Sequence, residues 1–350
     1  MPHPLIRLGS IGQSPWYDFI TRDLIASGEL ARLIRDDGLR GMTSNPTIFE
    51  KAITSSTDYD DDIRALTRRG LSTDAIVEAL MVADVQAACD AFAPMFNAEH
   101  NGDGTVSLEV PPTLAHDTAG TIAAAERLWA AVDRPNVMIK VPSTAAAISH
   151  LLAAGINVNI TLLFGIERYH QVIDAFCTGL ERRLAAGKGI ADLHSVASFF
   201  VSRLDGQTDP AIAAAGAAAA PLKGRIAIAN AILAYEAFSG SLLTPRWQAL
   251  AGKGASPQRP LWASTSTKDP ALPDTYYVEA LIAPDTVNTL PPATFAAYRD
   301  HGDPHVRITP DAVATAHQTL DSYHALGLPR LAERTAFLET DGVEKFSASW

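Results

Sequence analysis

Short apolar stretches alternate with longer amphipathic stretches along the whole chain. An apolar stretch of strand length, bounded by turn residues, is typical of a β-strand that is buried on both faces. We therefore expect eight strand cores, at Ser14–Phe19, Arg40–Ser44, Thr105–Val110, Asn136–Val141, Ile156–Thr161, Leu193–Phe199, Leu261–Thr265 and Asp285–Thr289.

The amphipathic stretches between these strands have the periodicity of helices. They lie at Asp23–Asp36, Thr73–Phe96, Thr118–Asp133, Thr144–Ala154, Phe164–Ala186, Pro210–Ser239 and Asp274–Ile282. Strands that alternate with helices favour a parallel sheet with crossover helices, and eight such units favour a closed barrel over an open doubly wound sheet.

The expected fold is thus α/β, a single (β/α)8 TIM barrel with extra terminal helices. We expect one domain over residues 1–350, with a barrel core at about residues 14–300 and C-terminal helices at about residues 305–345. The last two helices, Asp311–Leu326 and Arg330–Thr340, are expected to pack outside the barrel. The Pro210–Ser239 stretch includes the alanine-rich Ala211–Ala220 and is expected to end at Ser239-Gly240.

Composition narrows the class of protein. The chain has 350 residues, of which 47% are hydrophobic and 19% charged, as in a globular protein with a large core. A net charge of −11 argues against nonspecific nucleic-acid binding, and no apolar run has the length of a membrane span. The N-terminus lacks the features of a signal peptide, and the two cysteines lie in helix-like stretches. We therefore expect a cytoplasmic protein with reduced thiols and with neither nucleic-acid nor membrane partners.

Lys140 interrupts the apolar strand NVMIKVP, where a free ammonium group is costly to bury. A lysine whose charge is suppressed by burial is an amine that attacks carbonyl groups. The alternative is a structural lysine that is paired with a carboxylate.

The side-chain period of two separates polar from aliphatic faces on three strands. Thr105, Ser107 and Glu109 share one face, Met138 shares a face with Lys140, and Asn157, Asn159 and Thr161 share another. In a barrel the helices cover the aliphatic face, so the polar face points into the lumen. Its last members lie at the carboxyl-terminal rim, where barrel enzymes have their active sites. Glu109 and Lys140 at the ends of neighbouring strands therefore favour a catalytic function for this lysine.

Two further polar residues follow strands but are weak evidence by themselves. Asp18 ends the first strand, where an aspartate is also a common helix cap. Asn45 precedes Pro46 after the second strand, where an asparagine is also a common turn residue.

Hydroxyl and cationic side chains follow the sixth and seventh strands, a region that often binds phosphate in barrels. Ser198, Phe200, Ser202 and Arg203 belong to the first of these groups, and Ser264 and Lys268 to the second. The alternative for Arg203 is a surface pair with Asp205. His116-Asp117 and Asp58–Asp62 lack the ligand spacing of zinc and calcium sites, so we expect no metal.

Several of these segments together resemble the transaldolases, from about Ser14 to the last helices. The resemblance is carried by Gly41–Phe49 (GMTSNPTIF), Val106–Val110 (VSLEV), Ala115–Thr118 (AHDT), Val137–Pro142 (VMIKVP), Gly155–Phe164 (GINVNITLLF) and Arg259–Thr265 (RPLWAST). It implies a TIM-barrel transferase of the pentose phosphate pathway that works through a lysine Schiff base and needs no cofactor. A dihydroxyacetone unit would pass from sedoheptulose 7-phosphate or fructose 6-phosphate to glyceraldehyde 3-phosphate or erythrose 4-phosphate.

The resemblance also implies a role for each matching residue. Lys140 would form the Schiff base, Glu109 would be the acid/base, Asp18 the base for carbon–carbon cleavage, and Thr161 would orient the catalytic water. Asn45 and Asn159 would hold the three-carbon unit, Arg203, Ser264 and Lys268 would bind phosphate, and Ser198 and Phe200 would shape the pocket.

The chain departs from many members of that family at Ser266, where glycine is common, and at Lys268, where some branches have arginine. Both differences concern phosphate affinity more than chemistry. One alternative activity is that of a fructose-6-phosphate aldolase, which releases free dihydroxyacetone, and another is a catalytically silent barrel. Sugar phosphates are the expected small-molecule partners, and the expected oligomeric state is a monomer or a homodimer.

Overall fold

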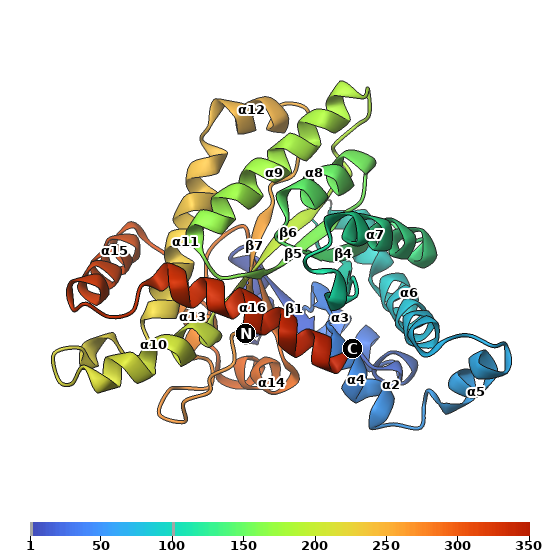
Figure 1. Ribbon diagram of the computed structural model, residues 1–350, viewed down its shortest axis with the longest axis horizontal. Helices are drawn as coiled ribbons and strands as arrows, with labels where there is room; N and C mark the ends of the chain where they lie inside the picture. The colour runs from blue at the N-terminus through green and yellow to red at the C-terminus, as the bar shows by residue number, and fades with distance from the viewer. Residues whose placement is uncertain (1–2, 100–101) are drawn as a thin grey trace.

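The computed structural model describes residues 3–99 and 102–350, and its centre is a closed barrel of eight parallel strands (Figure 1). The strands pair in chain order, and β8 closes the barrel against β1. Their bounds are β1 Gln13–Asp18, β2 Gly41–Thr43, β3 Thr105–Glu109, β4 Val137–Pro142, β5 Val158–Leu163, β6 Ser195–Phe200, β7 Arg259–Ala263 and β8 Thr286–Leu290. The expected (β/α)8 barrel and each of its eight strands are confirmed, with small shifts at the ends.

Helices surround the barrel. Their bounds are α1 Pro4–Ser10, α2 Arg22–Ala26, α3 Glu29–Asp36, α4 Pro46–Thr54, α5 Asp60–Arg68, α6 Thr73–Glu99, α7 Thr118–Val132, α8 Ala145–Ala154, α9 Ile166–Ala185, α10 Ser202–Ala214, α11 Ile226–Leu242, α12 Pro245–Ala251, α13 Tyr276–Ala280, α14 Pro292–His301, α15 Pro310–Ala325 and α16 Leu331–Ser349, with short 3-10 helices η1 Pro112–Leu114 and η2 Ala220–Leu222.

The continuous helix expected over Pro210–Ser239 is wrong. Helix α10 begins earlier and ends at Ala214, and α11 runs on through Gly240 to Leu242. Gly216 between them adopts φ +80°, a left-handed conformation that ends a helix and that alanine disfavours. The Asp23–Asp36 helix is likewise divided, because Gly28 adopts φ +82° between α2 and α3.

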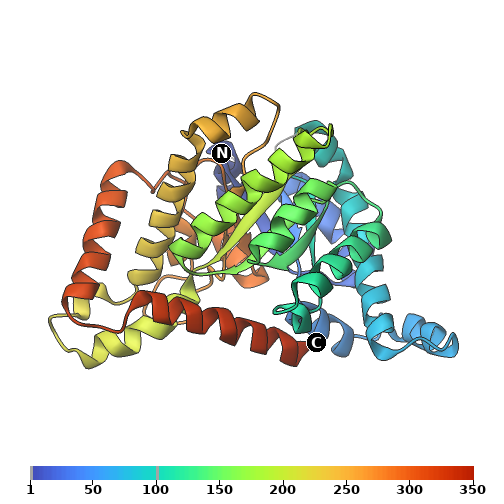
Figure 2. The same ribbon diagram turned by 45° about the horizontal axis from the view of Figure 1, so that its top comes forward.

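The last helix also differs from expectation. The sequence predicts that it ends at Thr340 and packs outside the barrel, but α16 continues to Ser349 and passes across the carboxyl-terminal end of the strands (Figures 1 and 2). It contacts β5, α4, α10 and η1. Its Leu338 and Phe346 are buried, so the helix has an apolar side that the barrel mouth covers.

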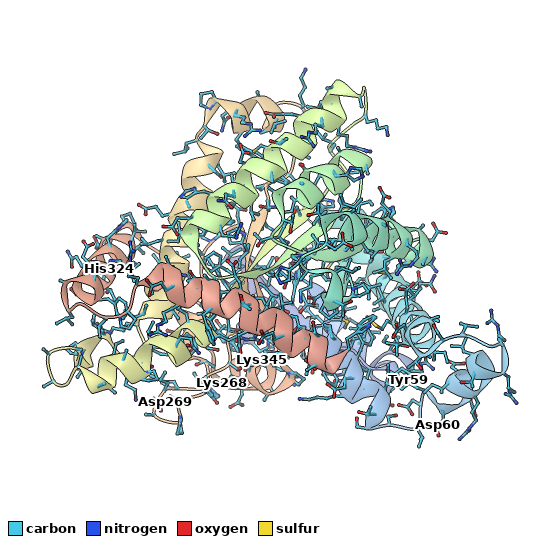
Figure 3. All side chains as sticks on the ribbon, in the orientation of Figure 1. Tyr59, Asp60, Lys268, Asp269, His324 and Lys345 are labelled. Atoms are coloured by element: carbon cyan, nitrogen blue, oxygen red, sulfur yellow. The ribbon has the colours of Figure 1, made fainter. Side chains whose placement is uncertain are left out.

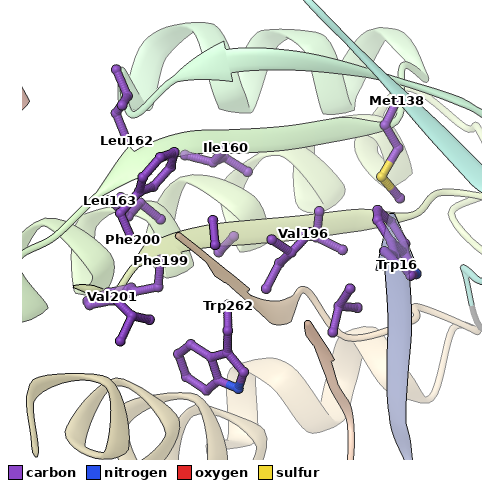
Figure 4. Packing of buried hydrophobic residues seen from close by; sticks show 14 of the residues in the cluster. Trp16, Met138, Ile160, Leu162, Leu163, Val196, Phe199, Phe200, Val201 and Trp262 are labelled. Atoms are coloured by element: carbon purple, nitrogen blue, oxygen red, sulfur yellow. The ribbon is translucent and has the colours of Figure 1, made fainter. Parts of the chain in front are cut away.

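Two apolar layers hold the barrel together. Between strands and helices, Phe199 of β6 meets Trp262 of β7 and Tyr169 of α9 edge to face (Figure 4). Inside the lumen, Trp16 and Met138 are fully buried and fill the level below the mouth. The lumen is therefore packed, and it gives the mouth a rigid floor.

At the opposite end the lumen is closed by a buried ion pair. Arg259 of β7 donates from Nη2 to Asp103 Oδ1 at 2.8 Å and from Nη1 to Ser14 Oγ at 2.9 Å. The aliphatic strand faces thus lie towards the helices, and polar side chains occupy both ends of the barrel interior.

Neither cysteine forms a disulfide; Cys89 of α6 and Cys177 of α9 are buried free thiols. In the described ranges, no single helix is both long and apolar enough to cross a membrane, although the bent pair of α11 and α12 together meets that criterion.

Gly41→Ala tests the packing of the lumen. A Cβ at Gly41 would lie 2.5 Å from the indole ring of Trp16, which is fully buried. Such overpacking costs about 1–3 kcal/mol, so we expect the variant to lose about that much free energy of unfolding in a urea titration.

Gly240→Ala is the matched control, because Gly240 lies in α11, where a Cβ would meet no atom of a neighbouring element within 4 Å. Alanine favours the helix by up to about 1 kcal/mol, so this variant should be unchanged or more stable. Equal stability of the Gly41 variant and the wild type would contradict the packing described for Trp16.

Candidate active site

The carboxyl ends of the strands surround a cavity of about 170 Å³. Eight residues expected from the sequence line it: Asp18, Asn45, Lys140, Ser198, Phe200, Arg203, Ser264 and Lys268. They come from five different strands or from the loops that follow them. The rule that polar residues at strand ends meet at one rim therefore places most of the candidate site together.

Lys140 and Glu109 are direct neighbours in the β3–β4 register. Both are about 4% exposed, and Lys140 Nζ lies 3.0 Å from Glu109 Oε2 and donates to the carbonyl oxygen of Ser44 at 3.3 Å. Among the described residues, Glu109 Oε2 accepts no hydrogen bond of good geometry. Burial raises the pKa of Glu109, and the nearby ammonium of Lys140 partly opposes this effect. The glutamate is therefore placed to take a proton from the amine or return one to a group attached to it.

The structural pairing proposed as an alternative for Lys140 is present, but it does not exclude chemistry. Lys140 lines the cavity, so a ligand reaches the amine. A lysine buried only for stability has no need of such access.

Asp18 lies across the mouth within a chain of hydroxyl groups. Thr43 Oγ1 donates to Asp18 Oδ1 at 2.7 Å, and Thr43 and Thr289 share a hydrogen bond of 2.6 Å. Burial raises the pKa of Asp18, against the opposing effects of Lys140, the Thr43 hydrogen bond and Arg203. The alternative of a helix cap is wrong, because Thr21 caps α2.

Asn159 stands beside Lys140 in the β4–β5 register and belongs to a buried polar network. Its amide nitrogen donates to Ser107 Oγ at 3.0 Å, and its oxygen accepts from Ser198 Oγ at 2.6 Å. These bonds hold Asn159 directly beside the amine of Lys140. Asn159 is not one of the residues that line the cavity.

Asn45 is a helix cap and not merely the turn residue named as its alternative, and it also lines the cavity. Its Oδ1 accepts from the backbone nitrogen of Ile48 at 3.0 Å and so caps α4. Because the cap uses only the oxygen, the amide nitrogen remains a donor for a ligand.

Thr161 is not brought into this cavity. It lines a neighbouring cavity of about 290 Å³ together with Ser143, Thr144 and residues of α16. The β5–β6 register shifts between Ile160 and Leu163, and Leu162 adopts φ +57°. Within the described ranges the buried Thr161 hydroxyl has no hydrogen-bond partner, so it is available to a water molecule in that cavity.

Arg203 forms the cationic side of the mouth. Its guanidinium carbon lies 5.1 Å from the ring centroid of Phe200 and 5.9 Å from that of Phe346. Burial lowers its pKa, while Asp341, Asp18 and Glu109 oppose this change. In the described part of the chain, its Nη1 is buried without a hydrogen-bond partner.

The proposed surface pair of Arg203 with Asp205 is wrong. Asp205 instead accepts hydrogen bonds from the backbone nitrogen of Ala227 and from the hydroxyl of Tyr277, both at 2.8 Å. Arg203 is thus left facing the cavity, where an anion would complete its hydrogen bonds.

The loop after β7 and the first residue of α10 add further donors beside Arg203. Ser264 adopts φ +55° and shares a hydrogen bond of 3.1 Å with Ser202, and Lys268 donates to Ser266 Oγ at 3.0 Å. Lys268 lies close to α16 in the view of Figure 3. Hydroxyl and cationic groups therefore gather at one side of the mouth, as a phosphate site requires.

Sequence reasoning missed several residues that line this cavity, among them Thr43, Thr289 and Phe346. Thr43 is the last residue of β2, and Thr289 precedes the last residue of β8. The expectation that polar residues at strand ends line the mouth, which we applied to other strands, could therefore have identified both. No local signal marks Phe346, which comes from the far end of the last helix. Among the described residues, no group of three or more His, Cys, Asp or Glu side chains could hold a metal ion.

Comparisons with known proteins agree with this geometry. A family model described as Transaldolase/Fructose-6-phosphate aldolase matches residues 15–350. A protein named Transaldolase from Acidothermus cellulolyticus is 51% identical over 353 residues, covering 100% of this chain and 95% of that protein. Transaldolase 1 of Streptomyces coelicolor is 48% identical over 99% of this chain and 92% of its own length, and Transaldolase 2 of Nostoc sp. is 49% identical over 91% and 87%.

Asp18→Asn tests the electrostatics of the mouth. Because burial raises the pKa of Asp18 in the folded protein, its contribution to stability is present at low pH and is lost as pH rises through that pKa. The asparagine variant should therefore be more stable than the wild type at pH 8, by about 0.5–2 kcal/mol as is common at active sites, and this gain should shrink towards pH 4.5.

Urea titrations at several pH values measure this difference. Asp192→Asn is the control, because it makes the same substitution at an exposed position before β6 that does not line the mouth cavity. A gain for the Asp18 variant that grows as pH falls would contradict the sign assigned to Asp18.

Proposed function

This chain belongs to the transaldolase/fructose-6-phosphate aldolase family, and from that premise we propose how the residues of its barrel mouth carry out the transaldolase reaction. The protein is a transferase that moves a three-carbon dihydroxyacetone unit between sugar phosphates. The observation that carries the residue assignments is a buried lysine, Lys140, which lines the mouth cavity 3.0 Å from the carboxylate of Glu109.

In the first step the neutral amine of Lys140 attacks the ketone carbon of the donor. Glu109 takes the proton that the nitrogen loses and returns one to the carbinolamine hydroxyl, which leaves as water. The product is a cationic imine that joins Nζ to the donor carbon. The raised pKa of Glu109 supports this assignment, because burial makes the carboxyl hold a proton more readily than an exposed glutamate does.

In the second step Asp18 takes the proton from the hydroxyl on the carbon beyond the scissile bond. The carbon–carbon bond breaks, its electron pair moves towards the cationic imine, and an aldose phosphate departs. An enamine remains on Lys140 until a second aldose phosphate captures it, after which the steps run in reverse. The position of Asp18 on the cavity wall, with Thr43 as a fixed hydrogen-bond donor, supports its role as base.

Asn45 and Asn159 hold the hydroxyl groups of the three-carbon unit in this proposal, and Ser198 fixes the amide of Asn159. Fixed donors of this kind restrict the reacting carbon to a productive orientation. Thr161 would hold the water of the imine steps from the neighbouring cavity, since its buried hydroxyl lacks a partner among the described residues.

Arg203, Ser264 and Lys268 bind the phosphate of donor and acceptor in this proposal, and Phe200 supports the guanidinium of Arg203. The donors would be sedoheptulose 7-phosphate or fructose 6-phosphate, and the acceptors glyceraldehyde 3-phosphate or erythrose 4-phosphate. We also propose that the protein works in the cytoplasm as a monomer or a homodimer.

The aldolase activity that releases free dihydroxyacetone is not favoured, because the relatives of high identity are named transaldolases. A silent barrel is also disfavoured, since Lys140, Glu109 and Asp18 all lie at the mouth. Omission of the acceptor, with an assay for free dihydroxyacetone, separates transfer from aldolase activity.

Borohydride trapping tests the assignment of Lys140. Reduction in the presence of fructose 6-phosphate should leave a three-carbon adduct on Lys140, which peptide mass mapping locates. Lys140→Met should form no adduct and lose transfer by at least about 10³-fold, because the covalent route is then closed. Lys188→Met is the control, since Lys188 is exposed and does not line the mouth cavity. An adduct on another lysine would overturn the assignment.

Arg203→Gln tests the phosphate site. Loss of a charged hydrogen bond costs about 1.5–3 kcal/mol, so the KM for fructose 6-phosphate should rise by about 10- to 100-fold. The kcat/KM for fructose, which lacks the phosphate, should change little. Initial rates with both donors measure the difference, and an equal loss with the two donors would contradict a phosphate contact.

A further inference from the structure

Phe346 is the α16 residue that lines the mouth cavity. Its side chain is 4% exposed, and its ring centroid lies 5.9 Å from Lys140 Nζ and 5.9 Å from the guanidinium carbon of Arg203. The last helix of the chain thus places an aromatic ring at equal distance from the amine of Lys140 and the guanidinium of Arg203.

Those two groups mark the two ends of a bound substrate, if the proposed function holds. Lys140 binds the ketone carbon and Arg203 the phosphate, so the ring covers the carbons between them. An aldehyde must approach the enamine in this same region. At 5.9 Å the attraction between a cation and a ring is near the limit of its range, so the main effect of Phe346 is to exclude water.

A second, polar cavity lies next to this region, one turn earlier along α16. The neighbouring cavity of about 290 Å³ is lined by the polar Ser143, Thr144 and Thr161, and by Thr340 and Val343 of α16. Phe346 lies one turn beyond Val343 on that helix and faces the sugar cavity instead. One face of α16 therefore covers two adjacent cavities, the polar one at Thr340 and Val343 and the one that holds the amine at Phe346.

Helix α16 is fastened on both sides of this region. Gly342 packs against β5 so closely that a Cβ there would lie 2.7 Å from Leu162 Cδ2. Ser349 shares a hydrogen bond of 2.9 Å with Thr47 of α4, the helix that Asn45 caps. These contacts lie before and after Phe346 in the chain, and they hold its ring in place over the mouth.

We propose that Phe346 keeps water from the enamine on Lys140 and so determines how often the three-carbon unit is transferred rather than released. This inference rests on the proposed function. Release requires that the enamine carbon takes a proton, that water adds to the imine carbon, and that the carbon–nitrogen bond breaks. The enamine and one water molecule thus give free dihydroxyacetone and the lysine amine. A ring that excludes water slows this reaction but leaves attack on an aldehyde open.

Three variants test the proposal. Phe346→Ala removes the cover, Phe346→Leu keeps part of its apolar volume, and Phe337→Ala removes the same side chain from an exposed position of the same helix, where it is 51% exposed. With fructose 6-phosphate as donor, two rates are measured: release of free dihydroxyacetone without acceptor, and transfer to erythrose 4-phosphate. Thermal unfolding of each variant is followed in parallel.

The ratio of release to transfer should rise about tenfold or more in Phe346→Ala, and by an intermediate factor in Phe346→Leu, because water reaches the enamine more often. Phe337→Ala should keep the wild-type ratio. The reducible adduct on Lys140 should still form in all variants, and without acceptor it should decay fastest in Phe346→Ala.

A wild-type ratio in both Phe346 variants overturns the proposal, and so does a proportional loss of both rates, which indicates a purely structural residue. If Phe346→Ala does not fold, an unchanged ratio in Phe346→Leu overturns it. Failure of the proposed function is distinct, because the wild type itself then forms no adduct on Lys140.

Discussion

The buried contact between Lys140 and Glu109 is the constraint around which this barrel mouth is arranged. Removing two charges from water costs several kcal/mol per ion, and a buried pair often adds nothing to stability. The barrel nevertheless places these two residues opposite each other in the β3–β4 register, 3.0 Å apart and almost inaccessible. The proposed mechanism accounts for this costly arrangement, because it requires a proton to move between the two groups.

The surrounding groups divide the small cavity into two electrostatic regions. Glu109 and Asp18 lie near the amine, and burial raises the pKa of both. Arg203 and Lys268 lie on the other side, where a phosphate would supply the missing negative charge. A chain with a net charge of −11 thus contains a local cationic site, which net charge alone would not reveal.

The parts of this structure that local rules determine could be predicted from the sequence. The period of two places Glu109, Lys140 and Asn159 on inward faces, and the order of the strands makes the first two neighbours. Longer-range features could not be predicted in this way. Gly216 and Gly28 divide helices because their backbone is left-handed, a conformation that periodicity does not encode.

The path of α16 across the barrel mouth could not be predicted from the sequence either. Its path depends on where Gly342 and Ser349 meet β5 and α4, and those contacts form only once the barrel is closed. For that reason the sequence does not single out Phe346, and it places Thr161 on the inward face of its strand without showing that this threonine opens to the adjacent cavity. This separation has a chemical consequence. Formation of the imine expels water and its hydrolysis needs water, whereas the enamine between these steps must be kept from it. A polar cavity beside Thr340 and Val343 of α16, and an amine covered by Phe346 at the next turn, meet both demands with a single helix.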